Sequence, residues 1–295
     1  MNRLANVPDH DFLLASSFMK TISDYVFPVR SDIRVRQGDL GRDGTVSTVG
    51  MARWLEDARI HLELPRFERL VAAGEFGPYQ IIFVSQSVER LAPARRTDTD
   101  IEVHTDIRRI GRSSFTYGHA VFAAGNRVGS GSATVVLYGT AGPLALPDEL
   151  VADLTALAGP DSSDTVVTRP NAERQQRNHY AYFAPLRARI SDVDINQHVN
   201  FIALATWYDE AVAAFTAAAL DIDGLVPDLS PSSFRIDYVG EVIYPGNYEI
   251  GVLVNSFDAN SVHYQLGIFL GSTCLGVADA IGPRGELRAK SLGPR

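Results

Sequence analysis

Two distant stretches of this chain repeat each other, and this repeat constrains the fold more than any other feature. RVRQGDLGRDGTVSTVGMARWLEDA (34–58) aligns without a gap with RARISDVDINQHVNFIALATWYDEA (187–211). The chain contains two tryptophans, Trp54 and Trp207, and both fall at the same place in the alignment. Chance does not readily produce such a match. A tandem duplication is therefore the first expectation for the fold.

A second match lies downstream of the first in both copies. VERLAPA (88–94) aligns with GEVIYPG (240–246), which pairs Glu89 with Glu241 and Pro93 with Pro245. Because both matches have nearly the same offset, the copies run in parallel along the chain. Each copy would be a module of about 120–150 residues, an ordinary domain size.

Both copies have the same expected order of secondary structure. A short strand (IRVRQ or LRARIS) leads through a loop into a long helix that is apolar on nearly every face, and such a helix must be buried. About four alternating β-branched and aromatic segments follow, separated by turn sequences, as antiparallel strands require. The pattern predicts an α+β fold in which each module wraps an antiparallel sheet around its central helix.

The segment between the copies is too long for a simple turn. It contains prolines, polar residues and one short expected helix at Pro147–Leu157. The predicted organisation is an N-terminal extension at 1–27, a first module at 28–141, a linker at 142–183 and a second module at 184–295.

Composition excludes several classes of function. The formal charge of −8 argues against a nucleic-acid surface, and the single cysteine, Cys274, excludes an intramolecular disulfide and a multi-cysteine metal site. The first residues lack a signal-peptide pattern, and the longest apolar runs are about ten residues, far short of the roughly 20 that span a bilayer. We expect a cytoplasmic protein without a bound metal or cofactor.

One short stretch, DVDINQHVN (192–200), contains more polar groups than a helix start needs. Capping requires one Asp or Asn, whereas this stretch has five polar groups at alternate positions. Asp194, Asn196 and His198 would point to one side of an extended chain. The following helix would add backbone N–H groups at its positive end. Attack of water on a carbonyl carbon needs such groups, because the water requires a base and the carbonyl oxygen a stabiliser.

The string DINQHVN resembles the D-x-N-x-H-V-N signature of plant and bacterial acyl-acyl-carrier-protein thioesterases, which are tandem "hotdog" proteins. In that family a Y-x-x-E-C segment completes the site, and here it reads Tyr238-Val239-Gly240-Glu241-Val242. The resemblance covers roughly residues 28 to 283. Two positions depart from the family pattern: Val242 replaces its cysteine, and Phe201 replaces its second asparagine.

The resemblance implies a fatty acyl thioester as substrate, carried by acyl carrier protein or by coenzyme A. Glu241 would activate water, while Asn196 and His198 would position the carbonyl and the water. Asp194 would orient that pair or would itself act as base or nucleophile. The backbone N–H groups of Val199 and Asn200 would face the substrate. The chain would work as a pseudo-dimer within itself, with a further homodimer also open.

The first copy serves as an internal control. Gly41, Asp43 and Thr45 stand where the second copy has Asp194, Asn196 and His198. We therefore expect one active site per chain, in the second module, with the first module shaping the acyl pocket. Two alternatives stay open: a dehydratase or hydratase of acyl thioesters, and a non-catalytic acyl-binding protein whose polar cluster only caps the helix.

Several other residues are expected to be structural. Asp192 recurs as Asp39 in the copy without the site, so a turn or cap role is favoured. The tryptophans fit core packing, and Cys274 fits an inert core position. The densest basic region is slightly better explained as a solvated sheet face than as a dock for an acidic carrier or for phosphates; it comprises Arg90, Arg95, Arg96, Arg108, Arg109 and Arg112.

Overall fold

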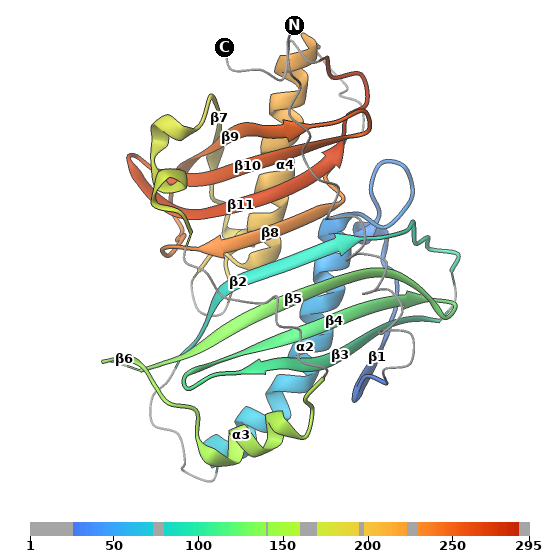
Figure 1. Cartoon of the computed structure of the whole chain (residues 1–295), viewed down its shortest axis with the longest axis vertical. Coiled ribbons are helices and arrows are strands. Elements are labelled where there is room, and N and C mark those ends of the chain that lie inside the picture. The colour runs from blue at the N-terminus through green and yellow to red at the C-terminus, as the bar shows by residue number, and fades with distance from the viewer. Residues whose placement is uncertain are drawn as a thin grey trace, which may run out of the picture.

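The computed structural model describes residues 26–72, 80–98, 100–139, 141–159, 170–194, 198–222 and 229–288. Its strands form one continuous antiparallel sheet in the order β1-β3-β4-β5-β2-β8-β11-β10-β9-β7, with the short β6 paired to β5. Two long helices lie along one side of this sheet, one behind each half (Figure 1). The predicted arrangement of two modules, each with a sheet around a helix, is confirmed.

Each half contains one long helix and its own strands. The first half has β1 (Val29–Ile33), α2 (Thr48–Ala72), β2 (Gln80–Arg90), β3 (Ile101–Ile110), β4 (Ser114–Ala123), β5 (Asn126–Gly139) and β6 (Gly142–Pro143). The second half has β7 (Tyr182–Arg187), α4 (Phe201–Leu220), β8 (Ser233–Tyr238), β9 (Asn247–Phe257), β10 (Ser261–Leu270) and β11 (Thr273–Pro283).

The two halves join through strands β2 and β8 at the middle of the sheet. These strands are antiparallel, in a register that runs from Ser85 opposite Asp237 to Glu89 opposite Ser233. Because β2 and β8 occupy corresponding places in the two modules, their pairing relates the halves by an approximate twofold axis. Backbone hydrogen bonds continue across the boundary, so the two modules share one sheet.

Each long helix is buried through its small and aromatic residues. Trp54 and Trp207 are each 3% exposed, as the sequence predicted for core residues. In the first half, α2 approaches the sheet closely: a Cβ on Gly129 would lie 2.2 Å from the Met51 sulfur, and one on Gly131 would lie 2.4 Å from a Leu55 methyl. Glycine at these two positions is therefore what lets the helix lie against the strands.

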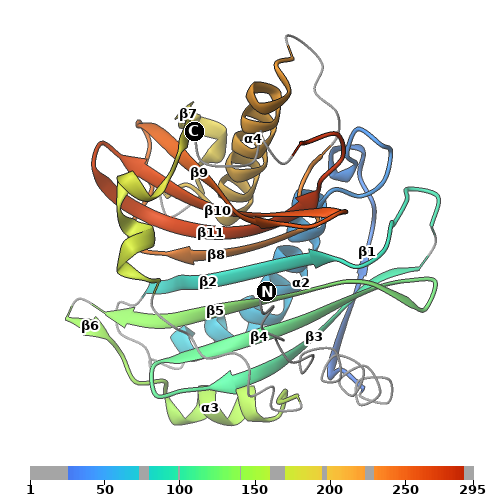
Figure 2. The same ribbon diagram turned by 45° about the horizontal axis from the view of Figure 1, so that its top comes forward.

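The segment between the modules covers parts of both halves. Its helix α3 (Asp148–Thr155) falls within the predicted Pro147–Leu157 and buries Leu150 and Leu154 against the first half. Two short 3₁₀ turns (Ala172–Gln175 and Arg177–His179) precede Tyr180. The Tyr180 ring lies on Gly251 of β9 and Gly267 of β10. In Figure 2 this part of the linker and helix α4 lie on opposite sides of the sheet. The linker thus closes the outer face of the second half.

Three strand boundaries differ from the expectation. The entry strands β1 and β7 lie upstream of most of IRVRQ and LRARIS, because the chain turns after them into 3₁₀ segments at Gln37–Asp39 and Ile190–Asp192. The alternating pattern of FRIDYVGEVIY (234–244) predicts one strand, but β8 ends at Tyr238, so VGEVIY is a loop. That loop turns away from the sheet to meet the start of α4. Among the described residues, no helix is long and apolar enough to cross a membrane.

Candidate active site

The DVDINQHVN stretch forms a closed loop at the start of α4. Val193 pairs with Val199, and the Asp194 N–H donates to the His198 carbonyl at 3.0 Å. The His198 N–H donates back to the Asp194 carboxylate at 3.3 Å. The expectation of an extended stretch is therefore wrong, because these bonds fold the chain back on itself. Asn196 lies outside the described residues.

The loop that follows β8 brings Glu241 beside His198. The Val199 N–H donates to the Val242 carbonyl at 2.8 Å, and His198 forms a β-bridge with Ile243. The His198 Nε2 atom lies 3.5 Å from the Glu241 Oε2 atom. Their side chains are 38% and 69% exposed, so the pair is open to water and to a ligand.

The start of α4 is capped and leaves two backbone donors. The Asn200 side chain accepts from the Ala203 N–H at 2.8 Å. The Asn200 N–H donates to the Asp192 carbonyl at 3.0 Å, and the Val199 N–H is also engaged, as above. Neither of these expected substrate donors is therefore open. Within the part of the chain that the structure describes, the N–H groups of Phe201 and Ile202 lack an acceptor, as the first residues of a helix do.

Tyr248 holds the Glu241 loop in place, and sequence reasoning missed this residue. Its hydroxyl accepts from the Ile243 N–H at 3.0 Å and donates to the Ile243 carbonyl at 2.6 Å. Its ring centroid lies 5.7 Å from that of Trp207 on α4. In the sequence Tyr248 is one of several aromatic residues in an alternating strand, so nothing in that pattern distinguishes it. Val242, in place of the family cysteine, is 4% exposed and packs in the core.

The first half lacks both members of the His198–Glu241 pair. Thr45 bridges to Arg95 as His198 bridges to Ile243, and the Val46 N–H donates to the Ala94 carbonyl at 2.7 Å. The residue two places before Arg95 is Pro93, which therefore occupies the position of Glu241. The predicted match of Glu89 with Glu241 is not reproduced, because Glu89 lies in strand β2 opposite Ser233.

The two repeated aspartates have the same structural role. Asp192 accepts from the Arg189 N–H at 2.8 Å, and Asp39 accepts from the Arg36 N–H at 2.8 Å. Asp39 also accepts from the indole N–H of Trp54 at 3.1 Å. These bonds close the turn before each helix, in agreement with the cap role that the repeat favoured.

Cys274 is buried, and its environment is that of a core residue. Burial raises the pKa of the Cys274 thiol, which disfavours the thiolate a nucleophile would need. In the predicted basic region, Arg90 donates to the Val46 carbonyl and Arg108 to the Asp106 carboxylate. These two arginines therefore serve contacts within the fold.

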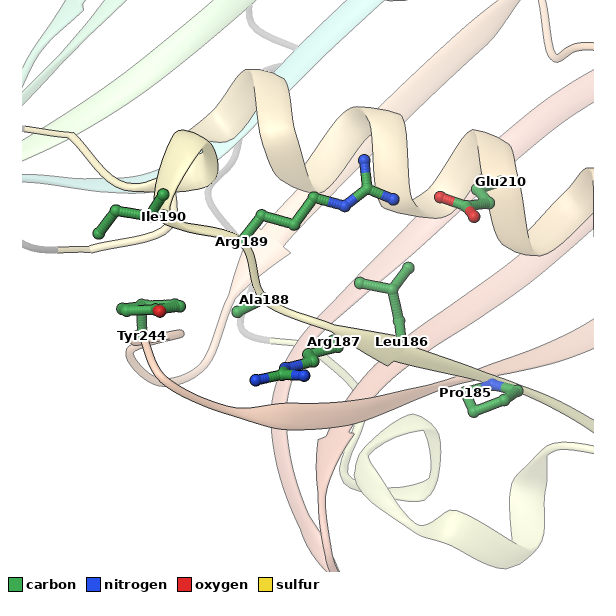
Figure 3. Close-up of a pocket in the computed structure, with 8 residues that line it drawn as sticks. All are labelled: Pro185, Leu186, Arg187, Ala188, Arg189, Ile190, Glu210 and Tyr244. Carbon is green, nitrogen blue, oxygen red and sulfur yellow. The ribbon is translucent and has the colours of Figure 1, made fainter.

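A groove of about 390 Å³ lies beside the candidate site. It is lined by Ile190, in the turn that leads into the DVDINQHVN stretch, and by Tyr244 of the Glu241 loop. Arg187, at the end of β7, and Arg189, just after it, line the groove together with Tyr244 of the Glu241 loop and Glu210 of α4 (Figure 3). Both arginines are exposed. The groove thus brings two cationic side chains and an aromatic ring to the edge of the candidate site.

The architecture defines the chain as a double-hotdog protein, and comparison with known structures agrees. The 12:0-ACP thioesterase from Umbellularia californica superposes with a TM-score of 0.65 and 16% identity, covering 86% of this chain and 97% of that chain. An acyl-ACP thioesterase from Bacteroides thetaiotaomicron gives the same values. No protein-family model and no curated protein sequence matches the chain. At this identity the likeness establishes the shared fold.

Proposed function

We propose that the protein hydrolyses acyl thioesters at the His198–Glu241 pair. The observation that carries the proposal is the 3.5 Å contact between these side chains beside the start of α4. It is formed in one half only, since Thr45 and Pro93 stand at the corresponding positions in the other. A pair needed only for the fold would be expected in both halves.

In the proposed reaction, Glu241 takes a proton from water as the water oxygen attacks the thioester carbon. His198 holds Glu241 and the water in line. The carbonyl oxygen becomes negative at the positive end of α4, where the N–H groups of Phe201 and Ile202 stabilise it. The carbon–sulfur bond then breaks, and the proton passes from Glu241 to the leaving thiolate. The products are a free carboxylic acid and a thiol.

Asp194 has a supporting part in this mechanism. Its carboxylate accepts the His198 N–H at 3.3 Å and so holds the residue that contacts Glu241. The alternative in which Asp194 is itself the base or nucleophile gives the same products, and the Glu241 variant described below separates the two.

We further propose that a fatty acyl group is carried to the site on a phosphopantetheine arm, as in acyl carrier protein or coenzyme A. The arginine-lined groove supports this, because guanidinium groups are well suited to bind a phosphate. Arg189 donates its backbone N–H to Asp192 of the turn that leads into the site loop. A phosphate held in the groove would therefore lie next to the loop that carries His198.

The proposal is tested by free-thiol release from medium- and long-chain acyl-carrier-protein and acyl-coenzyme A thioesters. Replacement of His198 by Ala, or of Glu241 by Gln, should lower kcat/KM by about a hundredfold or more, the scale of a lost catalytic group. The matched control is Glu89→Gln, which changes the glutamate that the sequence alone aligned with Glu241 and should leave hydrolysis unchanged.

Three outcomes would contradict the proposal in different ways. No thiol release from any thioester, with the thioesters still binding, would make the chain an acyl-binding protein. Full activity in Glu241→Gln with loss in Asp194→Asn would transfer the base to Asp194. An equal loss of kcat/KM in Glu89→Gln and Glu241→Gln would contradict the assignment of the active site to the second half alone.

A further inference from the structure

The loop that carries Glu241 has little apolar packing to fix its course. Val239 and Ile243, two residues before and two after Glu241, are 40% and 46% exposed, whereas Val242 is buried in the core. Before Glu241 the chain is held by the Val239 N–H, which donates to the Leu275 carbonyl at 3.0 Å. Hydrogen bonds of this kind therefore determine where the Glu241 side chain lies.

The Tyr248 hydroxyl holds the loop after Glu241 through both polar backbone groups of one residue. It accepts from the Ile243 N–H at 3.0 Å and donates to the Ile243 carbonyl at 2.6 Å. The Tyr248 side chain is itself immobilised, because the residue is 2% exposed and its ring centroid lies 5.7 Å from that of Trp207 on α4. Helix α4 starts directly after the loop that contains His198. Tyr248 thus connects the Glu241 loop to the helix that follows His198.

The first half has no hydroxyl at the position of Tyr248. Neighbouring strands give the equivalence, because four residues lie side by side in each half: Val103, Val121, Gly129 and Arg90 in the first, and Ile250, Ile268, Gly276 and Tyr238 in the second. Ile101 lies two residues before Val103, as Tyr248 lies two residues before Ile250. Ile101 is 3% exposed and packs in the core. An apolar side chain therefore meets the needs of the fold at this position.

The first half holds the corresponding loop residue by a local turn. Arg95 takes the place of Ile243 in the two β-bridges described above. The Arg95 N–H donates to the Asp98 carboxylate at 2.7 Å, and the Asp98 N–H donates to the Arg95 carbonyl at 3.0 Å. This turn closes on itself over three residues, whereas Tyr248 reaches from the loop to the buried face of a helix. The connection to the helix thus belongs to the half that has the His198–Glu241 pair.

We propose that Tyr248 is a positioning residue that sets Glu241 relative to His198. This inference rests on the proposed function. The Tyr248 ring packs on Trp207 of α4, and its hydroxyl fixes Ile243, two residues after Glu241. The two members of the pair, 3.5 Å apart, are therefore held against the same helix. Loss of the hydroxyl leaves the Glu241 loop free to move away from His198 while the ring stays in place.

The matched control is a second buried tyrosine that also packs on α4. Tyr264 of β10 is 1% exposed, and its ring centroid lies 6.0 Å from that of Phe215. Among the described residues, its hydroxyl bonds no part of the Glu241 loop. Tyr248→Phe and Tyr264→Phe each remove one buried hydroxyl and keep the ring against the helix. The bond to Ile243 is what distinguishes them.

Two measurements compare these variants with the wild type. The first is the exchange rate of the Ile243 amide hydrogen, followed by NMR, which we expect Tyr248→Phe to raise about tenfold, the scale of one lost hydrogen bond. The second is the kinetics of thioester hydrolysis. Tyr248→Phe should lower kcat about tenfold with KM unchanged, because substrate still binds while Glu241 is misplaced. Tyr264→Phe should change neither the exchange rate nor kcat.

A double variant shows whether Tyr248 acts through Glu241. In Glu241→Gln the proposed base is already lost, so the addition of Tyr248→Phe should lower kcat no further. A residue that only stabilised the fold would lower kcat by the same factor with Glu241 present and with Glu241 replaced.

The measurements separate this inference from the proposed function. An unchanged exchange rate at Ile243 in Tyr248→Phe would overturn the positioning role, whatever the activity. Equal falls of kcat in Tyr248→Phe and Tyr264→Phe would also overturn it, as would a further fall in the Glu241→Gln background. A wild type without hydrolytic activity would refute the proposed function alone, and the exchange at Ile243 would still decide whether Tyr248 holds the loop.

Discussion

At the scale of single residues, His119 shows how strongly the first half departs from an apolar core. It is 3% exposed in β4, and its Nδ1 atom lies 3.0 Å from the Thr105 hydroxyl. Burial, together with the charges of Arg59 and Arg108, lowers the pKa of His119 to about 3. The imidazole is therefore neutral in the folded protein at ordinary pH.

This burial predicts a pH-dependent stability. Below the unfolded-state pKa of 6.5 the unfolded chain binds a proton at His119 that the folded chain excludes down to a pH of about 3. Stability from this group is present above pH 6.5 and is lost as the pH falls, by about 1.4 kcal/mol per pH unit at most. Urea unfolding of the wild type and His119→Leu (the residue of the second half) should diverge in this window. Parallel pH dependences would contradict the prediction.

One residue-level prediction from the sequence, the match of Glu89 with Glu241, was wrong. Glu89 and Glu241 align because E and P recur at the same spacing, yet the bridges to Thr45 and His198 place Pro93 at the position of Glu241. The first half has five more residues than the second along this path, because α2 has 25 residues and α4 has 20. An alignment of the two sequences does not show that difference in length, whereas the backbone pairing does.

At the scale of elements, the repeat correctly predicted both helices and the four strands after each. It missed the pairing of Asp194 with His198, because that pairing depends on a carboxylate accepting a backbone N–H four residues away. It also assigned the Val199 and Asn200 donors to the substrate. A helix-start rule does not reveal that the neighbouring Val242 and Asp192 carbonyls already accept them.

The helix caps allow a matched prediction. Asn200 caps α4, and at the same place in the repeat the Ser47 hydroxyl accepts from the Gly50 N–H at 2.9 Å. Asn200→Ala and Ser47→Ala should each lower the free energy of unfolding by about 1 kcal/mol, the usual worth of a cap. Only Asn200→Ala should also reduce thioester hydrolysis, since only α4 starts at the candidate site. Equal losses of activity in variants of equal stability would refute this.

At the scale of the whole molecule, duplication leaves two similar grooves with different surroundings. The groove of the first half, about 700 Å³, is lined by Arg34 and Arg36, as that of the second is by Arg187 and Arg189. These arginines correspond in the sequence repeat. Tyr244 of the Glu241 loop lines the second groove, whereas the first groove is lined by residues of the half without the His198–Glu241 pair. The first groove therefore serves as a comparison for carrier binding to the second.

The double variant Arg187→Ala/Arg189→Ala should therefore raise KM for a phosphopantetheine-carried thioester about tenfold, with kcat unchanged. Two exposed charge-assisted contacts to a phosphate together supply about that much binding energy. The rise should shrink at high ionic strength, because salt screens exposed charges. Arg34→Ala/Arg36→Ala should leave KM unaltered, since its groove faces the half without the pair. Equal changes in both double variants would mean that the arginines stabilise the fold. No change in either would place the phosphate elsewhere on the surface.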